Sequence, residues 1–172
     1  NQLMALHYND PVPMAMSLKI NLFGKLDIGK KDNKGNYVPD TKFKISYNAD
    51  MSNPIGTYTT GSNGKVLVDE LRPGTVYIQE TDVPKHLVLD TTIRSAIVKT
   101  AQTTSFEATN KWKQGRIQVV KKDAETNKVV NKAGTIFDIS DSNNKKVASI
   151  TTNEKGIATS ELLDYGTYYV KE

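Results

Sequence analysis

The chain contains the same sequence pattern twice, about 90 residues apart. Residues 24–32, GKLDIGKKD, return as residues 115–123, GRIQVVKKD. Further on, residues 59–80 align without a gap to residues 151–172 and share a Thr-Thr pair, a Gly-Thr pair and a final glutamate. A period of this length is that of a small domain rather than of a solenoid repeat. We therefore expect two copies of one domain in tandem.

Both copies have the pattern of β-structure. Short runs that alternate apolar and polar residues, such as 42–47 and 75–80, are separated by turn residues such as 61–64, Gly-Ser-Asn-Gly. Many short strands at this spacing are typical of β-sandwiches. We therefore predict an all-β protein of two tandem β-sandwich domains, in which residues 69–71 and 161–163 have room for a single helical turn at most.

The repeat also sets the expected domain boundaries. Residues 1–16 show no periodicity and are expected to be a linker or the end of a preceding domain. Residues 17–112 are expected to form the first sandwich and residues 113–172 the second. The second copy has no counterpart of the residues that follow Glu80, so we expect it to lack its last strands.

Residues 17–23 alternate like a strand that precedes the first copy. Asn21 stands before Gly24 much as Asn110 stands before Gly115. We hypothesise that residues 17–23 end a preceding domain of the same kind.

The composition excludes several classes of function. The sequence has no cysteine, which rules out disulfides, thiol catalysis and cysteine-ligated metals within it. Its two histidines, His7 and His86, belong to no nucleophile or metal pattern, so we expect no cofactor and no metal. The net charge of +4 comes from scattered lysines, and one tryptophan between Lys111 and Lys113 is too weak a signal to predict a nucleic-acid partner. No apolar run approaches the ~20 residues that span a bilayer, so we expect no membrane contact in this segment.

Three polar residues of the first copy stand where a strand should be apolar. Side chains alternate between the two faces of a strand, so Lys30 shares a face with Leu26 and Ile28. Glu80 and Asn110 stand in the same relation to the apolar residues before them. We therefore expect an amine, a carboxyl and a carboxamide on the core face of one domain.

These groups suggest a covalent reaction. Burial away from water favours the neutral forms of an amine and of a carboxylic acid. A neutral amine is a nucleophile, and a protonated carboxyl can pass protons. The first and last strands of a sandwich are commonly neighbours, which would bring Lys30 beside Asn110. Attack by the Lys30 amine on the Asn110 carboxamide would expel ammonia and leave a Lys–Asn isopeptide bond, with Glu80 as the acid–base catalyst.

A plain structural interpretation remains open beside this one. Lys30 would then reach solvent from a strand end, Glu80 would form a salt bridge with it, and Asn110 would cap a turn. In the second copy the lysine and the glutamate return as Lys121 and Glu172, again at core-facing positions of their strands, with Glu172 as the corresponding catalytic group. The acceptor for Lys121 would lie beyond the end of this sequence.

Several motifs resemble one known family. Lys30-Lys31-Asp32 and Lys121-Lys122-Asp123 resemble its Lys-x-Asp strand end, residues 73–84 its Pro-Gly-Thr-Tyr-x-x-x-Glu-Thr-x-Ala-Pro segment, and Thr109-Asn110 its last strand. The chain is similar to the Cna B-type (SpaA-like) domains of Gram-positive surface adhesins and pilins. That resemblance implies a transthyretin-like or reverse-immunoglobulin sandwich in which Lys30 and Asn110 are joined and Glu80 is catalytic. Val83 and residues 85–87 depart from the family pattern, in the loop after Glu80.

The function that we expect is structural. The bond would tie the first strand to the last, so the chain would serve as a rigid stalk module of a cell-wall-anchored adhesin or pilin outside the bacterial cell, anchored through regions outside this sequence. The reaction would occur once per molecule, which is not enzyme turnover. We expect a monomer whose contacts with host matrix or cell-surface proteins are made by other domains. Two alternatives stay open: a ligand-binding adhesin module that contacts host matrix proteins, and an accessory domain of a cell-wall enzyme.

Overall fold

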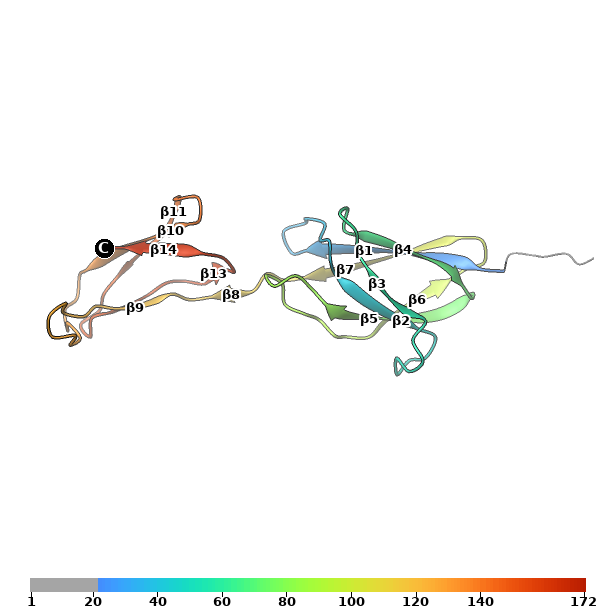
Figure 1. Cartoon of the computed structure of the whole chain (residues 1–172), viewed down its shortest axis with the longest axis horizontal. Coiled ribbons are helices and arrows are strands. Elements are labelled where there is room, and N and C mark those ends of the chain that lie inside the picture. Colours follow the sequence, from blue (N-terminus) through green and yellow to red (C-terminus); the bar gives the residue numbers. More distant parts are fainter. Residues whose placement is uncertain (1–21) are drawn as a thin grey trace, which may run out of the picture.

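The computed structural model describes residues 22–172, which form two successive all-β units along one long axis (Figure 1). The strands of the first unit are β1 (Gly24–Asp32), β2 (Lys42–Ser46), β3 (Gly56–Thr59), β4 (Lys65–Leu71), β5 (Gly74–Asp82), β6 (Arg94–Val98) and β7 (Thr103–Asn110). Those of the second are β8 (Gln114–Gly115), β9 (Gln118–Val120), β10 (Ile136–Asp141), β11 (Lys146–Thr151), β12 (Ile157–Thr159), β13 (Leu163–Asp164) and β14 (Tyr168–Lys171). The all-β fold predicted from the alternating pattern is confirmed.

The first unit is a sandwich of two sheets. One sheet has the strand order β4-β1-β7 and the other β3-β2-β5-β6. The alternating apolar side chains of both sheets form one core, which consists of Leu26, Ile28, Phe43, Ile45, Val68, Leu71, Val76, Ile78 and Val98. Each of these side chains is almost fully removed from water, and burial of this kind supplies the main stabilising free energy of the unit.

The first and last strands of this unit lie side by side. β1 pairs with β7 in parallel, with Lys30 opposite Ala108 and Asp32 opposite Asn110. The other edge of β1 pairs with β4 in antiparallel orientation. Lys30 and Asn110 therefore lie on neighbouring strands of one sheet, two positions apart in register.

The second unit repeats the strand pairings of the first. The pair β9–β12 corresponds to β1–β4, β10–β11 to β2–β3, and β10–β14 to β2–β5. The short pair β8–β13 corresponds to the contact between Gly24 and Leu71. In the first unit, β7 pairs with β1 and β6 pairs with β5. Within residues 22–172, the corresponding strands of the second unit, β9 and β14, have no such additional partner. Its apolar cluster is correspondingly small and consists of Phe137, Ile139, Ile150 and Ala158.

A glycine in the same place in both units closes a tight turn. Gly64 has a φ of 70°, and a Cβ atom there would stand 2.7 Å from the Tyr37 Cβ. Gly156 has a φ of 71°, and a Cβ atom would stand 2.1 Å from the Val130 carbonyl oxygen. Only glycine combines this φ with this close approach. The aligned glycines are therefore explained by the turns that precede β4 and β12.

Two details differ from the sequence-based expectations. The helical turn for which residues 69–71 had room does not form, because these residues continue β4, where Glu70 takes a φ of 55° next to a shift in the register with β1. Residues 161–163 are not helical either, and they lead into β13. The short strands β3, β8 and β13 are too brief to give an alternating pattern of their own.

Part of the sequence lies outside the described residues. Residues 1–16 and Asn21, and with them the hypothesis of a preceding domain, belong to that part. Of residues 17–23, Leu22 and Phe23 are described, and the Phe23 carbonyl oxygen accepts a hydrogen bond of 2.9 Å from the Ala101 amide. Among residues 22–172, no helix is long and apolar enough to cross a membrane.

Candidate functional site

Three polar side chains are buried together at one end of the first sandwich. Lys30 is 0% exposed, Glu80 5% and Asn110 4%. Lys30 comes from β1 and Asn110 from the adjacent β7, whereas Glu80 comes from β5 in the facing sheet. Lysine and glutamate side chains are almost never fully buried unless they are paired, so Lys30 and Glu80 must both have charge or hydrogen-bond partners inside the sandwich.

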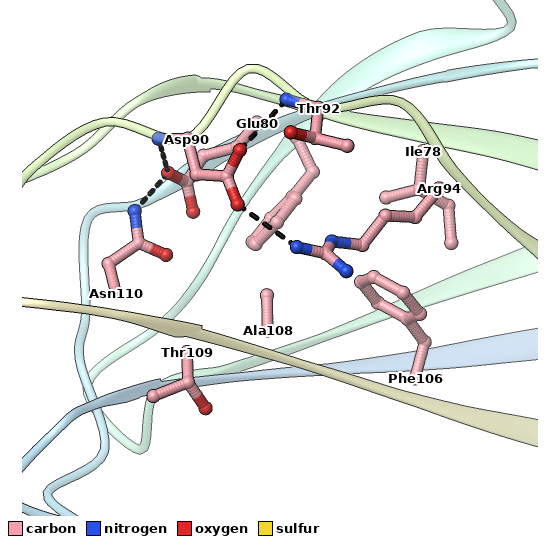
Figure 2. Close-up of a pocket in the computed structure, with 10 residues that line it drawn as sticks. Ile78, Glu80, Asp90, Thr92, Arg94, Phe106, Ala108, Thr109 and Asn110 are labelled. Atoms are coloured by element: carbon pink, nitrogen blue, oxygen red, sulfur yellow. Dashed lines mark hydrogen bonds and ion pairs between the residues drawn. The ribbon is translucent and has the colours of Figure 1, made fainter.

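Glu80 contacts the other two residues with different oxygen atoms. Its Oε2 lies 3.6 Å from the Lys30 Nζ. Its Oε1 accepts a hydrogen bond from the Asn110 Nδ2, as Figure 2 shows. The Lys30 Nζ also donates to the Lys31 carbonyl oxygen at 3.1 Å. The carboxyl group therefore lies between the amine and the carboxamide and contacts both.

Burial controls the charge of the lysine. Removal from water lowers the pKa of Lys30 below its ordinary value, and this effect exceeds the opposing attraction of Glu80 and, more weakly, of Asp32 and Asp90. A lower pKa increases the fraction of Lys30 in the neutral, nucleophilic form. Burial therefore shifts Lys30 toward the form of the amine that can attack a carbonyl carbon.

The corresponding residues of the second unit meet as well, but they face water. Lys121 Nζ forms an ion pair with Glu172 Oε1, and their side chains are 26% and 56% exposed. This differs from the expectation that Glu172 lies on a core face. The reason is that, in the described part of the chain, β9 and β14 have open edges where the first unit has β7 and β6.

Two further residues extend the site toward the second unit, although the sequence analysis gave them no role. Asp32 follows Lys30 on the inner face of β1 and is 4% exposed. Its Oδ2 accepts a hydrogen bond of 2.9 Å from the Trp112 Nε1. Asp32 lies two positions beyond Lys30, and Trp112 lies two positions beyond Asn110. Alternation along the strands therefore predicts that their side chains point to the same face as those of Lys30 and Asn110.

Asp32 is a carboxylate at neutral pH. Burial by itself would raise the pKa of Asp32, but hydrogen bonds from Trp112, Asn36 and the Lys34 amide outweigh it and lower the pKa to about 2. The charge therefore persists over the whole physiological range and holds the strand ends together.

Lys34 joins the two units. Its Nζ lies 3.9 Å from the centre of the Trp112 ring and forms an ion pair of 2.6 Å with Asp164 of the second unit. Asp164 also accepts a hydrogen bond of 3.0 Å from the Gln114 side chain, and His86 packs against Trp112 with 4.4 Å between ring centres. We call Lys34, His86, Trp112 and Asp164 the junction cluster.

We predict that the junction cluster limits the independent motion of the two units. Lys34→Gln removes a half-exposed ion pair and a cation–π contact, together worth about 1 kcal/mol, and should raise the population of separated units about fivefold. NMR relaxation of amides in each unit measures this, because separated units tumble faster. Lys99→Gln, a change on the exposed far end of the first unit, is the control. Equal tumbling in both variants and the wild type would contradict the prediction.

The described residues contain no metal-binding constellation. Among residues 22–172, no group of three or more histidine, cysteine, aspartate or glutamate side chains is placed to hold a metal ion.

Comparison with known proteins identifies relatives of both units. The family model described as SpaA, prealbumin-like fold domain, matches residues 24–112 and 115–172. Among solved structures, the Bacillus anthracis TIE protein is similar with 27% sequence identity and a TM-score of 0.75, over 87% of this chain and 28% of that chain. None of the curated proteins matches this sequence significantly.

Two pilins are similar in fold. The streptococcal ancillary pilin aligns with 21% identity and a TM-score of 0.50, over 88% of this chain and 54% of that chain. BcpA, the major pilin subunit of Bacillus cereus, aligns with 16% identity and a TM-score of 0.54, over 80% of this chain and 52% of that chain. The chain thus spans about half or less of each of these three proteins.

Proposed function

Since the chain belongs to the SpaA family of prealbumin-like fold domains, we propose that it is a stalk module of a bacterial surface adhesin or pilin, stabilised by a Lys30–Asn110 isopeptide bond. The observation that supports the bond is the position of Glu80, which contacts the amine with one oxygen and the carboxamide with the other while all three side chains are buried. The module is structural and not an enzyme, because the reaction occurs once in each molecule.

The proposed reaction needs no outside reagent. The neutral Lys30 Nζ attacks the Asn110 Cγ, and a bond forms between them. Glu80 takes a proton from the attacking nitrogen and then gives that same proton to the Asn110 Nδ2. The bond between Cγ and Nδ2 then breaks and ammonia leaves, so one amide replaces another and the protons balance.

The position of the bond suits a stalk under tension. Tension enters the first unit at the start of β1 and leaves it at the end of β7, which runs parallel to β1. A link between Lys30 and Asn110 would carry the force directly from β1 to the segment that leads into the second unit. The residues between them, which include β2 to β6, would then be bypassed.

The second unit would complete the same reaction only with an acceptor from outside residues 22–172. Lys121 and Glu172 are already paired there, as Lys30 and Glu80 are in the first unit. We place the whole module outside the cell on a Gram-positive surface, as a monomer in which contacts with host proteins are made by other domains. Wall anchoring would likewise be the task of other regions.

The intact mass of the purified chain tests this proposal. The wild type should weigh less than its sequence mass by one ammonia, and each of Lys30→Ala, Glu80→Ala and Asn110→Ala should restore the full mass. Thr109→Ala, an exposed neighbour on β7, is the control and should keep the deficit. Full mass in the wild type would refute the proposed bond.

A further inference from the structure

The segment that follows β5 returns along the end of β7. Leu87 forms a β-bridge with Trp112, and the Val88 amide donates to the Lys111 carbonyl oxygen at 2.9 Å. The Lys113 amide donates to the His86 carbonyl oxygen at 2.7 Å, and Leu87 itself is fully buried. The backbone of this segment is therefore fixed beside Asn110.

This segment holds the nitrogen atom that the proposed reaction expels. The Asn110 Nδ2 has two hydrogen atoms, one donated to Glu80 and the other to the Val88 carbonyl oxygen at 2.7 Å. Two acceptors on either side fix the rotation of a carboxamide about its last bond. Val88 therefore determines, together with Glu80, which face of the amide is presented to the amine.

Asp90 fixes the same segment through its side chain. Its Oδ1 accepts a hydrogen bond of 3.0 Å from the Thr92 amide, and its Oδ2 pairs with the Arg94 guanidinium at 3.0 Å (Figure 2). In this turn the Asp90 amide points at Glu80 and donates to its Oε1 at 3.1 Å. The oxygen that contacts the leaving nitrogen is thus held by a second donor.

A small cavity adjoins these groups. It has a volume of about 20 Å³, and its lining includes Glu80, Asp90, Thr92, Arg94 and Asn110 (Figure 2). A polar cavity needs roughly 10–15 Å³ or more to hold one water molecule, so this cavity has room for one molecule of ammonia, which is of similar size and forms the same kinds of hydrogen bond. Hydrogen bonds from Thr92 and the Arg94 charge lower the pKa of Asp90 to about 2, so the cavity is lined by a carboxylate at neutral pH.

We propose that residues 88–92 form the leaving-group site of the cross-linking reaction, with Asp90 as the positioning residue that shapes it. The inference rests on the proposed function and adds the residues that orient and release its by-product. Val88 and Glu80 hold the Asn110 Nδ2 while Lys30 attacks. Glu80 then gives this nitrogen its third hydrogen, and the ammonia passes into the cavity beside Asp90 and Arg94.

The rate of ammonia loss after synthesis tests the role of Asp90. The full chain is made in a short cell-free translation pulse, samples are denatured at successive times, and intact mass gives the cross-linked fraction. Asp90→Ala removes the acceptor for the Thr92 amide and should slow the reaction about tenfold, the effect of a barrier about 1.4 kcal/mol higher. Asp90→Asn keeps an oxygen at Oδ1 and should restore most of the rate.

Asp50→Ala is the matched control. Asp50 Oδ1 accepts a hydrogen bond of 2.9 Å from the Ser52 amide, so it caps a similar turn in a loop far from the site, and its loss should leave the rate unchanged. Lys30→Met cannot form the bond, so its stability does not depend on the rate of the reaction. Comparing the unfolding temperatures of Lys30→Met and Lys30→Met/Asp90→Ala therefore shows whether Asp90→Ala destabilises the first unit itself.

The outcomes distinguish this inference from the proposed function. A wild type of full mass overturns the isopeptide bond itself. A wild type that loses ammonia while Asp90→Ala reacts at the same rate overturns only the role of residues 88–92. The same conclusion follows if Asp90→Asn is as slow as Asp90→Ala, or if Asp90→Ala is slow because its unit has unfolded.

Discussion

Lys30→Met should leave the first unit folded but lower its unfolding temperature by about 20 °C or more, since each kcal/mol is worth roughly 4–8 °C in a domain of this size. The isopeptide bond would close a loop of about 80 residues, which the chain-entropy treatment of cross-links values at roughly 4–5 kcal/mol. Methionine is unbranched and fills much the same space as lysine, so the variant loses the bond with little change in packing, while Glu80 keeps its hydrogen bonds from the Asn110 side chain and the Asp90 amide. Thermal unfolding of the two proteins measures the difference.

Lys25→Met is the matched control for this change. Lys25 lies on the same strand but points outward, and its side chain is 46% exposed in an ion pair with Asp69. An exposed pair contributes about 0–1 kcal/mol, so the unfolding temperature should move by a few degrees at most. Lys30→Met should also be cleaved by proteases faster than Lys25→Met or the wild type, because a unit with cross-linked strands unfolds less often. Equal unfolding temperatures for Lys30→Met and the wild type would show that the bond contributes no stability.

Glu80→Gln should be the most damaging change at the site. It prevents the proton transfer on which the bond depends, and it leaves the buried Lys30 ammonium without its counter-charge. Breaking a buried ion pair by removing one partner costs about 3–5 kcal/mol. Without Glu80, the buried amine keeps the Lys31 carbonyl oxygen as its hydrogen-bond partner, whereas Glu80 in Lys30→Met keeps two donors. We therefore expect Glu80→Gln to be less stable than Lys30→Met, by at most this amount, and the double variant Lys30→Met/Glu80→Gln to recover most of the loss. Denaturant unfolding of the three proteins measures these differences.

The pH dependence of Glu80→Gln provides an independent check. Burial already lowers the pKa of Lys30, and removal of the Glu80 attraction lowers it further. The unfolded chain then binds more protons than the folded one between the lowered pKa and the ordinary lysine value, so stability should rise with pH over that interval. Glu107→Gln, which removes a half-exposed carboxylate paired with Lys31 on the outer face of β7, should show neither the loss nor this pH dependence. A Glu80→Gln protein as stable as Lys30→Met would contradict the argument.

Alternation along the strands was sufficient to select the three buried polar residues. A strand sends every second side chain to the same face, so Leu26 and Ile28 predict where Lys30 points without any coordinates. The repeat supported the selection, because Lys121 and Glu172 stand at equivalent places. That Lys30 and Asn110 are covalently joined stays a prediction until the mass is measured.

The contacts of residues 84–92 could not be predicted in the same way. This segment has no alternation, and its role depends on main-chain atoms such as the Val88 carbonyl and the Asp90 amide, whose direction is set by a turn. The residue types themselves carry no signal for such contacts. The junction cluster was missed for a related reason, since Lys34 and Asp164 lie far apart in the sequence and meet only because two folded units adjoin.

By itself, the sequence determined the β architecture, the two copies and the identity of the amine, acid and carboxamide, because all of these follow from local periodicity and from repetition. Only the tertiary structure decided that β1 and β7 run in parallel, that Glu80 reaches both partners from the opposite sheet, and that the pair Lys121 and Glu172 remains open to water. The physical reason is that burial and proximity depend on which strands cover an edge, and strand pairing joins residues that are distant along the chain.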